Sequence, residues 1–395
     1  MAYERTQLKT LLNRVNEKRR FIQVLSGPRQ VGKTTLLSQL QEMVDIPVHF
    51  VSSDNVSAPG KAWVSQQWEI ARFKSNQAAS KESLLIIDEI QKIPDWSEVV
   101  KEEWDSDSRH NNNVKVILSG SSRLMLQQGL KESLAGRFET TTMLHWSFTE
   151  MKTVFGWTPD QYAWFGGYPG SADLIADEPR WKKYVSESLL EATISKDILM
   201  LTRVDKPALM RRLFEIGCLY TGQFLSFTKI LGQLDDAGNT TTLAHYLKLL
   251  DSAGLLGGLE KYSRAAFRSR GSSPKFIVHN TALIGALQSE DFSEIRAIPD
   301  RWGRVVESVV GAHLMNYAKS ENVSLCYWNY EGHEVDFVLS KGSKTIAIEV
   351  KSGRTGKLNG MDAFRKQFNP DKVLLVGTGG LPWEEFIAID IDEIF

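Results

Sequence analysis

Residues 21–40 read FIQVLSGPRQVGKTTLLSQL, and this stretch decides how the N-terminal part of the chain folds. Its beginning, residues 21–26, is the short apolar run that is typical of a buried strand in a parallel sheet. Residues 27–34 match the pattern G-x-x-x-x-G-K-[ST] at every position, and a helical sequence follows. A strand, a glycine-rich loop and a helix in this order predict a loop whose backbone N–H groups surround phosphate oxygens at a helix N-terminus.

The side chains of this loop predict which parts of a nucleotide it would hold. Lys33 is expected to reach the β- and γ-phosphates, and Thr34 is expected to bind Mg²⁺. The alternative is a chance glycine-rich turn, which would have neither role. The sequence therefore predicts a nucleotide-binding loop made by Gly27, Pro28, Arg29, Gln30, Val31, Gly32, Lys33, Thr34 and Thr35.

A second apolar run ends in two carboxylates, in SLLIIDEIQKIP at residues 83–94. On a strand beside the loop, Asp88 would hold Mg²⁺, and Glu89 would orient and polarise the water that attacks the γ-phosphate. Taken alone, such a run is usually a strand that reaches solvent. Together with a phosphate-binding loop, it predicts nucleotide hydrolysis and not binding alone.

A third apolar run, VKVILSG at residues 114–120, predicts a further strand with polar residues at its end. Either Ser119 or Ser121 would sense the γ-phosphate there, and a plain serine-rich turn is the alternative. Arg137, in SLAGRF, is a candidate γ-phosphate arginine that would act in cis or from a neighbouring subunit, and a surface arginine is the alternative. The sequence shows no Asn-Lys-x-Asp guanine motif, so ATP is favoured over GTP.

Residues 221–285 predict a helix-turn-helix followed by a wing. Ser226 would cap a first short helix, and TTTLAHYLKLLDSAGLL at residues 240–256 would form a second, amphipathic helix after a glycine turn. DNA contact is one interpretation, with the second helix in the major groove and the wing on phosphates. A packing or protein-contact module is the other. The wing would be a stretch without acidic residues that contains Lys261, Arg264, Arg268, Arg270 and Lys275.

Residues 334–353, EVDFVLSKGSKTIAIEVKSG, predict a hairpin closed by Gly342 and Ser343. Pairing around this turn makes one face wholly apolar and sets Asp336 directly opposite Glu349 on the other face. Two facing carboxylates repel each other and destabilise a sheet unless a cation neutralises them. Mg²⁺, with Mn²⁺ as the alternative, suits one or two carboxylates plus water molecules.

A further carboxylate comes from RWGRVVESVVGAHLMNY at residues 301–317. In a helix, Gly303, Glu307 and Gly311 lie in one stripe, and the two glycines would allow close backbone approach around the glutamate. This pattern resembles the metal site of restriction-endonuclease-like nucleases, in which Lys351 would help to activate water. The alternative is a solvated, salt-bridged surface. The predicted metal ligands are Glu307, Asp336 and Glu349.

The composition limits the remaining options. At 395 residues, two or three domains are expected, and a formal net charge of -1 leaves any nucleic-acid contact to a local patch. Cys218 and Cys326 share no motif, which argues against a disulfide framework or a zinc site and fits a reducing cytoplasm. The N-terminus is too charged for a signal peptide, and no apolar run has membrane-spanning length. A cytoplasmic protein without membrane contact is therefore expected.

Taken together, the motifs resemble those of a prokaryotic family of predicted ATPases over almost the full length. At the N-terminal end the resemblance rests on GPRQVGKTTLL, LLIIDEIQKIP, LSGSS, SLAGR and GGYP, and at the other end on GRVVES and EVDFVL with IAIEVKSG. Members join an AAA-like P-loop domain to a winged helix and a restriction-endonuclease-like domain. One departure is Val335, which stands where many such nucleases have proline before the aspartate.

The resemblance implies an α/β protein with a parallel-sheet P-loop ATPase domain at 1–150, a helical linker region at 151–220, a winged helix at 221–285 and a small nuclease-like α/β domain at 290–395. It implies ATP and Mg²⁺ as cofactors. The ATPase roles fall to Lys33, Thr34, Asp88 and Glu89, and the nuclease pattern is filled by Glu307, Asp336, Glu349 and Lys351.

Three functions fit these expectations. The first is an ATPase whose hydrolysis drives a metal-dependent nuclease that acts on DNA. The second is a regulatory ATPase whose nuclease-like domain binds DNA or protein without cleaving. The third is a protein-remodelling ATPase that holds a partner protein or a second copy of itself. The complete set of carboxylates and lysine favours the first function, whereas the near-neutral charge favours the other two.

Overall fold

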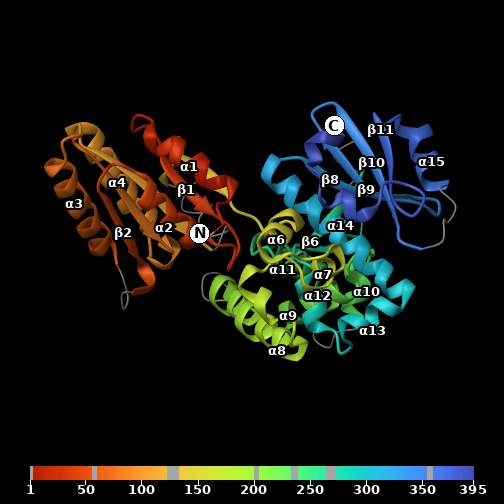
Figure 1. Cartoon of the computed structure of the whole chain (residues 1–395). Coiled ribbons are helices and arrows are strands. Elements are labelled where there is room, and N and C mark those ends of the chain that lie inside the picture. The colour runs from red at the N-terminus through yellow and green to blue at the C-terminus, as the bar shows by residue number, and fades with distance from the viewer. Residues whose placement is uncertain are drawn as a thin grey trace. The chain divides into compact units, whose positions relative to one another are not determined.

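The chain forms two compact α/β units (Figure 1). Unit 1 comprises Met1–Leu144 and Lys196–Thr202, and unit 2 comprises His145–Ser195 and Arg203–Phe395. The structure is a computed structural model that describes residues 3–55, 60–121, 133–199, 204–232, 239–263, 273–353 and 359–395.

Unit 1 is built on a five-stranded parallel sheet with the strand order β2-β3-β4-β1-β5. The sequence predicts strands at three apolar runs. These runs form β1, β3 and β4, so the predicted parallel sheet is confirmed. The strand bounds are β1 Ile22–Ser26, β2 Val48–Ser52, β3 Glu82–Asp88, β4 Asn113–Gly120 and β5 Phe138–Thr142.

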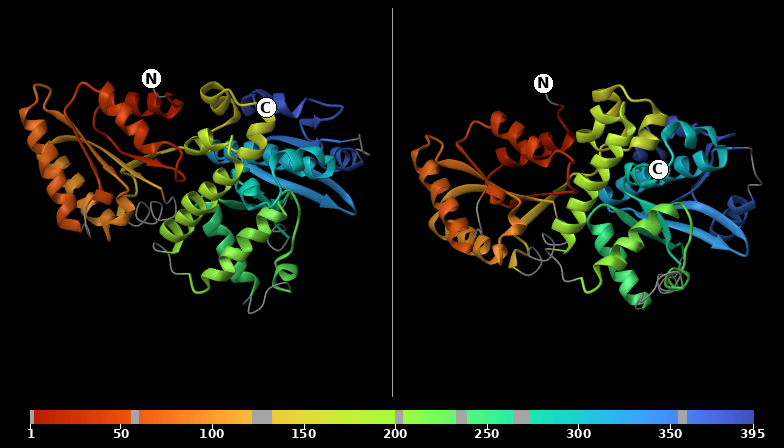
Figure 2. Two further views of the ribbon diagram at one scale, coloured as in Figure 1. Left: turned by 60° about the horizontal axis from the view of Figure 1, so that its bottom comes forward. Right: turned by 90° about the horizontal axis from the view of Figure 1, so that it is seen from below.

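Helices cover both faces of this sheet (Figure 2). Alternate residues of β3 show the division: Leu84 and Ile86 pack in one core cluster, and Leu85 and Ile87 pack in the other. Because the strands are parallel, the carboxyl ends of β1, β3 and β4 meet at one edge, where sheets of this kind bind ligands. The helices are α1 Thr6–Asn16 and α2 Lys33–Met43 on one face, α3 Lys61–Gln77 and α4 Trp96–His110 on the other, and the short η1 Ser53–Asn55 and η2 Ile90–Lys92.

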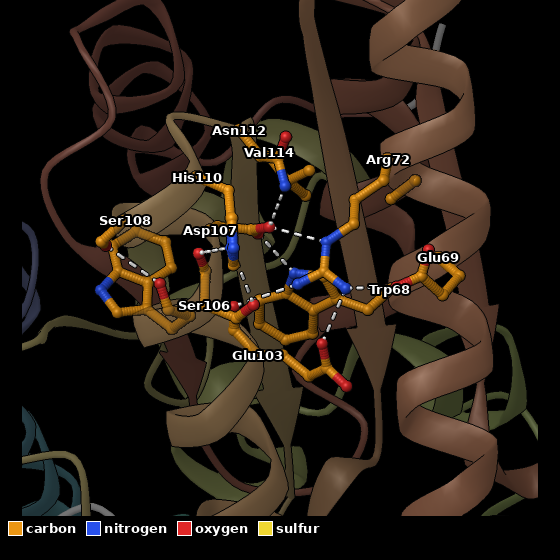
Figure 3. Close-up of polar contacts among 12 residues, drawn as sticks. Trp68, Glu69, Arg72, Glu103, Ser106, Asp107, Ser108, His110, Asn112 and Val114 are labelled. Carbon is orange, nitrogen blue, oxygen red and sulfur yellow. Dashed lines mark hydrogen bonds and ion pairs between the residues drawn. The ribbon is translucent and has the colours of Figure 1, made fainter.

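A buried carboxylate joins α3 to α4 (Figure 3). Asp107 is fully buried and accepts hydrogen bonds from Trp68 Nε1 and Arg72 Nε, both at 2.7 Å, and from Asn112 Nδ2 at 3.1 Å. Arg72 also forms an ion pair with Glu103 at 2.8 Å. A buried charge is tolerated only when it is paired and hydrogen-bonded in this way.

Asp107→Asn is therefore expected to destabilise unit 1, because Arg72 loses its buried counter-ion and an amide NH₂ group faces other donors. Breaking a buried ion pair costs about 3 kcal/mol, which corresponds to a melting temperature about 6 to 12 °C lower in a domain of this size. Calorimetry of the full chain measures the shift. Asp105→Asn on the same helix is the control, because Asp105 pairs with Arg137 at the surface and both are about a third exposed. Equal shifts for the two variants would contradict this role of Asp107.

The N-terminal part of unit 2 is helical, as expected for residues 151–220. Ser147 and Thr158 each begin a capping box, which fixes the starts of α6 and α7. The helices of unit 2 are α6 Phe148–Phe155, α7 Pro159–Phe165, η3 Pro169–Leu174, α8 Glu178–Lys183, η4 Tyr184–Leu190, α9 Pro207–Leu219, α10 Phe227–Leu231, α11 Thr240–Ser252, α12 Ala282–Leu287, α13 Phe292–Ala297, α14 Pro299–Glu321, α15 Asn359–Phe368, α16 Trp383–Phe386 and η6 Ile391–Ile394, and η5 Thr193–Leu199 leads back into unit 1.

The C-terminal part of unit 2 contains a six-stranded mixed sheet with the order β11-β10-β9-β8-β6-β7. β9 and β10 are the predicted hairpin, and the register Ile346↔Leu339 and Ile348↔Phe337 is the predicted one. Gly342, in the turn, has a positive φ of 60°. The strand bounds are β6 Leu256–Lys261, β7 Lys275–Val278, β8 Ser324–Tyr330, β9 His333–Lys341, β10 Lys344–Lys351 and β11 Lys372–Gly377.

α14 packs closely on this sheet, as the glycine spacing predicted. A Cβ atom on Gly311 would lie 3.0 Å from Phe337 Cζ and 3.0 Å from Ile277 Cδ1. A Cβ on Gly303 would lie 2.6 Å from Ser352 Oγ. The stripe that carries Glu307 therefore faces the sheet.

The predicted helix-turn-helix appears as α10 and α11, and the side chain of Ser226 caps α10. Residues 233–238, which include part of the predicted glycine turn, and the predicted wing residues Arg264, Arg268 and Arg270 lie outside the described residues. The strands that flank the wing, β6 and β7, pair with each other, and β6 also pairs with β8. The segment predicted as a winged helix thus shares one sheet with the segment predicted as a nuclease-like domain. Among the described helices, none is both long enough and apolar enough to cross a membrane.

Candidate functional site

The phosphate-binding loop lies between the end of β1 and the start of α2. Gly32, at the helix N-terminus, has a φ of 93°, a conformation that glycine adopts without strain. A Cβ atom on Gly27 would lie 2.1 Å from the carbonyl oxygen of Met143, so a larger residue does not fit there. Both glycines of the motif are therefore required by the backbone path of the loop.

Lys33 is buried inside its own loop. Its ammonium donates hydrogen bonds to the carbonyl oxygens of Gly27 at 2.9 Å and Pro28 at 2.8 Å. Burial lowers the pKa of Lys33, although the carboxylates of Glu89 and Asp88 act in the opposite direction. The lysine thus lies in the loop where a polyphosphate would be held, and neutral carbonyls are its hydrogen-bond acceptors.

Asp88 joins the ends of three elements. Thr34 Oγ1 donates to Asp88 Oδ2 at 2.8 Å, while the Ser119 hydroxyl and the backbone N–H of Glu89 both donate to Asp88 Oδ1. Asp88 itself is buried. The structure therefore brings together Thr34, Asp88 and Ser119, which the sequence predicted at one site. A hydroxyl and a carboxylate oxygen at this distance are the hard ligands that Mg²⁺ takes from proteins, with water and phosphate oxygens supplying the rest.

Glu89 stands next to Asp88 in an unusual backbone conformation, with a φ of 56°. Its Oε2 accepts a hydrogen bond from Gln91 Nε2 at 2.6 Å and lies 3.1 Å from Ser121 Oγ, while its backbone carbonyl accepts one from Ser53 Oγ at 2.7 Å. Glu89 also lines a cavity of about 630 Å³ together with Thr34, Phe50, Val51, Ser52, Asp54, Asn55, Trp63, Gln67 and Asp88. Sequence reasoning missed Gln91 and Ser53, although Gln91 stands only two positions after Glu89.

Arg29 makes a two-pronged ion pair that the sequence did not suggest. Its Nε and Nη2 donate to Asp197 Oδ2 and Oδ1, each at 2.7 Å. Asp197 is buried and also accepts from Ser121 Oγ at 3.0 Å. Burial acts to lower the pKa of Arg29, but the hydrogen bonds and charge of Asp197 outweigh it and raise the pKa. Asp197 is 168 positions away along the chain, so no local pattern could have indicated it.

Arg137, the candidate γ-phosphate arginine, is held by another residue. Its Nε and Nη2 donate to Asp105 at 2.8 and 3.0 Å, and this contact lowers the pKa of the Asp105 carboxyl. Arg137 Nη1 donates to the Ala135 carbonyl oxygen at 3.4 Å. The structure therefore does not bring Arg137 together with the loop residues, and a role in trans stays a prediction.

The carboxylates predicted as a metal site line one cavity of about 630 Å³ in unit 2. A lysine from β7 lies among them: Lys275 Nζ is 2.8 Å from Glu307 Oε1, 2.9 Å from Asp336 Oδ1 and 3.6 Å from Glu334 Oε1. Lys275 is fully buried. The prediction that Lys275 is a surface cation of a DNA-binding wing is wrong, because its side chain is buried and pairs with Glu307 and Asp336.

The other predicted residues of this cluster are also engaged. Asp336 Oδ2 accepts a hydrogen bond from the backbone N–H of Val350 at 2.9 Å. Glu349 Oε1 pairs with Lys351 Nζ at 2.6 Å, while Glu349 Oε2 is buried without a hydrogen-bond partner among the described residues. Glu307, Asp336, Glu349 and Lys351 thus line one cavity, and the buried Lys275 contacts two of them, Glu307 and Asp336.

Burial sets the electrostatics of this cluster. It raises the pKa of Glu307 and of Glu349, and the neighbouring Asp336 adds to both shifts. Burial alone would lower the pKa of Lys275, but Asp336, Glu307 and Glu334 outweigh it and raise that pKa. In the described ranges, no group of three or more His, Cys, Asp or Glu side chains is arranged to hold a metal ion. The cations found among these carboxylates in this structure are the ammonium groups of Lys275 and Lys351.

Three segments of the chain match known families. Residues 19–152 match a family described as an AAA domain, so the loop and the carboxylates of unit 1 belong to an AAA-type P-loop domain. Residues 157–294 and 302–392 match two domains of unknown function, DUF8612 and DUF4143. The unit 1 site is therefore placed in a class, whereas the carboxylate cluster of unit 2 is not.

Individual relatives are distant. An uncharacterized protein of Haemophilus influenzae is 23% identical over 350 residues, which cover 84% of this chain and 82% of that protein. An uncharacterized protein of Mycobacterium tuberculosis is 26% identical over 347 residues, which cover 85% and 71%. A Walker-type ATPase of Pyrococcus abyssi has a similar fold, with a TM-score of 0.51 at 13% identity over 73% of this chain and 96% of that chain.

The ammonium of Lys275 leads to a prediction about metal ions. Lys275→Met should lower the melting temperature of unit 2 by about 6 to 12 °C, because removing one partner of a buried ion pair costs about 3 kcal/mol. Mg²⁺ or Mn²⁺ should restore part of this loss in the variant and leave the parent chain unchanged, since only the variant lacks the ammonium between Glu307 and Asp336. Thermal unfolding of the full chain with and without the ions measures both effects. Lys261→Met, on the neighbouring strand, is the control, and an equal metal-induced shift in the parent would contradict the role of Lys275.

Proposed function

We propose that this protein binds ATP and hydrolyses it to ADP and phosphate. The observation that carries the proposal is the arrangement at the carboxyl end of β3, where Asp88 is hydrogen-bonded to the loop residue Thr34 and Glu89 lines the adjoining cavity. Simple nucleotide binding needs the loop and the magnesium ligands. A second carboxylate held beside them, without a role in metal binding, supports hydrolysis.

Each residue has a defined task in this proposal. When ATP binds, Lys33 gives up its hydrogen bonds to the two loop carbonyls and binds β- and γ-phosphate oxygens. Its positive charge interacts more strongly with these anionic oxygens than with neutral carbonyls. Thr34 and Asp88 would hold Mg²⁺, which neutralises charge that develops on the phosphates. Glu89 orients a water molecule and accepts its proton as the water oxygen bonds to the γ-phosphorus and the bond to ADP breaks. Ser119 fixes Asp88.

Two variants test this assignment. Lys33→Ala should weaken ATP binding markedly, because the charge aimed at the γ-phosphate is lost. Glu89→Gln should keep ATP binding and slow hydrolysis by about 100-fold or more, because an amide cannot accept the proton. Titration with a fluorescent ATP analogue and phosphate release measure the two effects. Glu98→Gln, a largely exposed glutamate on α4, is the matched control. If Glu89→Gln hydrolyses ATP as fast as the parent does, the assignment of Glu89 is wrong.

For unit 2, we propose a regulatory role in which the C-terminal sheet binds DNA or a protein partner without cutting it. Lys275 supports this choice, because its ammonium supplies the positive charge among Glu307 and Asp336 that cleavage chemistry would need from a metal ion. The second candidate is a DNA-directed nuclease that ATP hydrolysis drives. Its support is that Glu307, Asp336, Glu349 and Lys351 line one cavity.

A DNA assay separates these two roles. The parent chain should leave linear and plasmid DNA uncut with Mg²⁺ or Mn²⁺, with and without ATP. If DNA is bound, replacing Arg264, Arg268 and Arg270 by glutamine should flatten the salt dependence of binding by about one unit of log–log slope per lost phosphate contact. Electrophoresis and fluorescence anisotropy measure cleavage and binding. Cleavage that is abolished by Lys351→Ala would establish the nuclease in place of the regulatory role.

A further inference from the structure

The hydroxyl group of Ser121 lies between two carboxylates in unit 1. Its Oγ is 3.1 Å from Glu89 Oε2 and 3.0 Å from Asp197 Oδ1, and the serine is buried. A hydroxyl group carries a single hydrogen, and an ionised carboxylate carries none. Ser121 can therefore donate to Glu89 or to Asp197, but not to both at the same time.

The other partners of these groups leave the choice open. Arg29 contacts both oxygens of Asp197, and Gln91 Nε2 donates to Glu89 Oε2 at 2.6 Å. Gln91 Nε2 also lies 3.3 Å from Ser121 Oγ, where the hydroxyl acts as the acceptor. Asp197 thus already accepts hydrogen bonds from Arg29, and Glu89 already accepts one from Gln91. The two carboxylates compete for the single hydrogen of Ser121.

Asp197 comes from a segment of unit 1 that is separated in sequence from the rest of that unit. It lies on η5, Thr193–Leu199, and the part of η5 from Lys196 onward belongs to unit 1. The chain reaches it only after passing through residues 145–195, which belong to unit 2. Asp197 therefore lies only two positions after the end of this unit 2 segment. It contacts Arg29 of the phosphate-binding loop and Ser121, which in turn contacts Glu89.

We propose that Asp197 is a positioning residue that keeps the Ser121 hydrogen away from Glu89. When the Ser121 hydroxyl donates to Asp197, an acceptor position of Glu89 Oε2 stays free for the water molecule that Glu89 orients and deprotonates. When Asp197 moves away from Ser121, the Ser121 hydroxyl donates its hydrogen bond to Glu89 instead, and ATP hydrolysis slows. This inference rests on the proposed ATPase function and adds a regulatory input to it: the path of residues 196–199 sets the rate of hydrolysis.

The alternative is that Asp197 only anchors Arg29. In that case Asp197 would affect how the loop binds ATP, with no influence on Glu89 through Ser121. The two possibilities differ in a double-mutant cycle, because coupling through Ser121 disappears once its hydroxyl is gone. They also differ in the steady-state parameter that changes, since Arg29 belongs to the loop and Glu89 to the chemical step.

The test uses the full chain with Asp197→Asn, Ser121→Ala and the double variant. Asp197→Asn removes the negative charge of the Asp197 side chain, so a neutral amide competes with the Glu89 carboxylate for the Ser121 hydrogen, and the hydrogen bond forms preferentially to Glu89. We expect kcat to fall about 10-fold, as for one added hydrogen bond to a charged group. Ser121→Ala removes the hydrogen for which the two carboxylates compete, so it is the background in which Asp197→Asn should no longer lower kcat. Because Asp197→Asn also weakens the contact with Arg29 in the phosphate-binding loop, its KM should rise. The double variant should have the kcat of Ser121→Ala and the raised KM of Asp197→Asn.

Two outcomes would overturn the inference. One is a kcat loss from Asp197→Asn that persists in the Ser121→Ala background. The other is a kcat equal to that of the parent in Asp197→Asn, or in Asp197→Ser if Asp197→Asn fails to fold. Asp45→Asn, an exposed position in unit 1, is the control for the charge change. Failure of the proposed function looks different: the parent would release no phosphate, or Lys33→Ala would release it at the parent rate.

Discussion

The site of unit 1 depends on the register in which three parallel strands meet. β1 pairs with β4 so that Ser26 lies beside Gly120, and β3 pairs with β4 so that Ile87 lies beside Leu118. A slip of one residue in a strand turns each of its side chains to the opposite face. The Asp88 carboxylate would then lose its hydrogen bonds with both Thr34 and Ser119. The alternating apolar residues of the two cores oppose such a slip, so the packing of the sheet also fixes the positions of Asp88, Thr34 and Ser119.

Much of this arrangement could be predicted from the sequence, because its determinants are local. The loop motif, its strand and its helix lie within a single stretch of 20 residues, and the carboxylates follow an apolar run of strand length. The hairpin register in unit 2 was predictable for a similar reason. A two-residue turn at Gly342 and Ser343 leaves one pairing that buries every apolar residue on the same face.

The partners of these groups could not be predicted, because they come from distant parts of the chain. Asp197 is 168 positions from Arg29, and Lys275 is 61 positions from Asp336. Both are ordinary charged residues in segments with no motif, and Lys275 lies in a basic stretch that is typical of a solvated wing. A weak signal was present: Lys275 opens the apolar run KFIV, which is a fully buried strand in the structure. A charged residue at the start of such a run can point inward when it has acidic partners.

Two buried lysines show why the two units differ in what they can do. The acceptors of Lys33 are neutral carbonyls, and burial lowers its pKa, so phosphate oxygens would be better partners than those it has. The partners of Lys275 are carboxylates at 2.8 and 2.9 Å, which raise its pKa. Removing that ammonium would leave buried charges unpaired at a cost of about 3 to 5 kcal/mol. Lys33 therefore donates to neutral acceptors in its loop, whereas Lys275 already pairs with two carboxylates, so an added anion would stabilise the first ammonium more than the second.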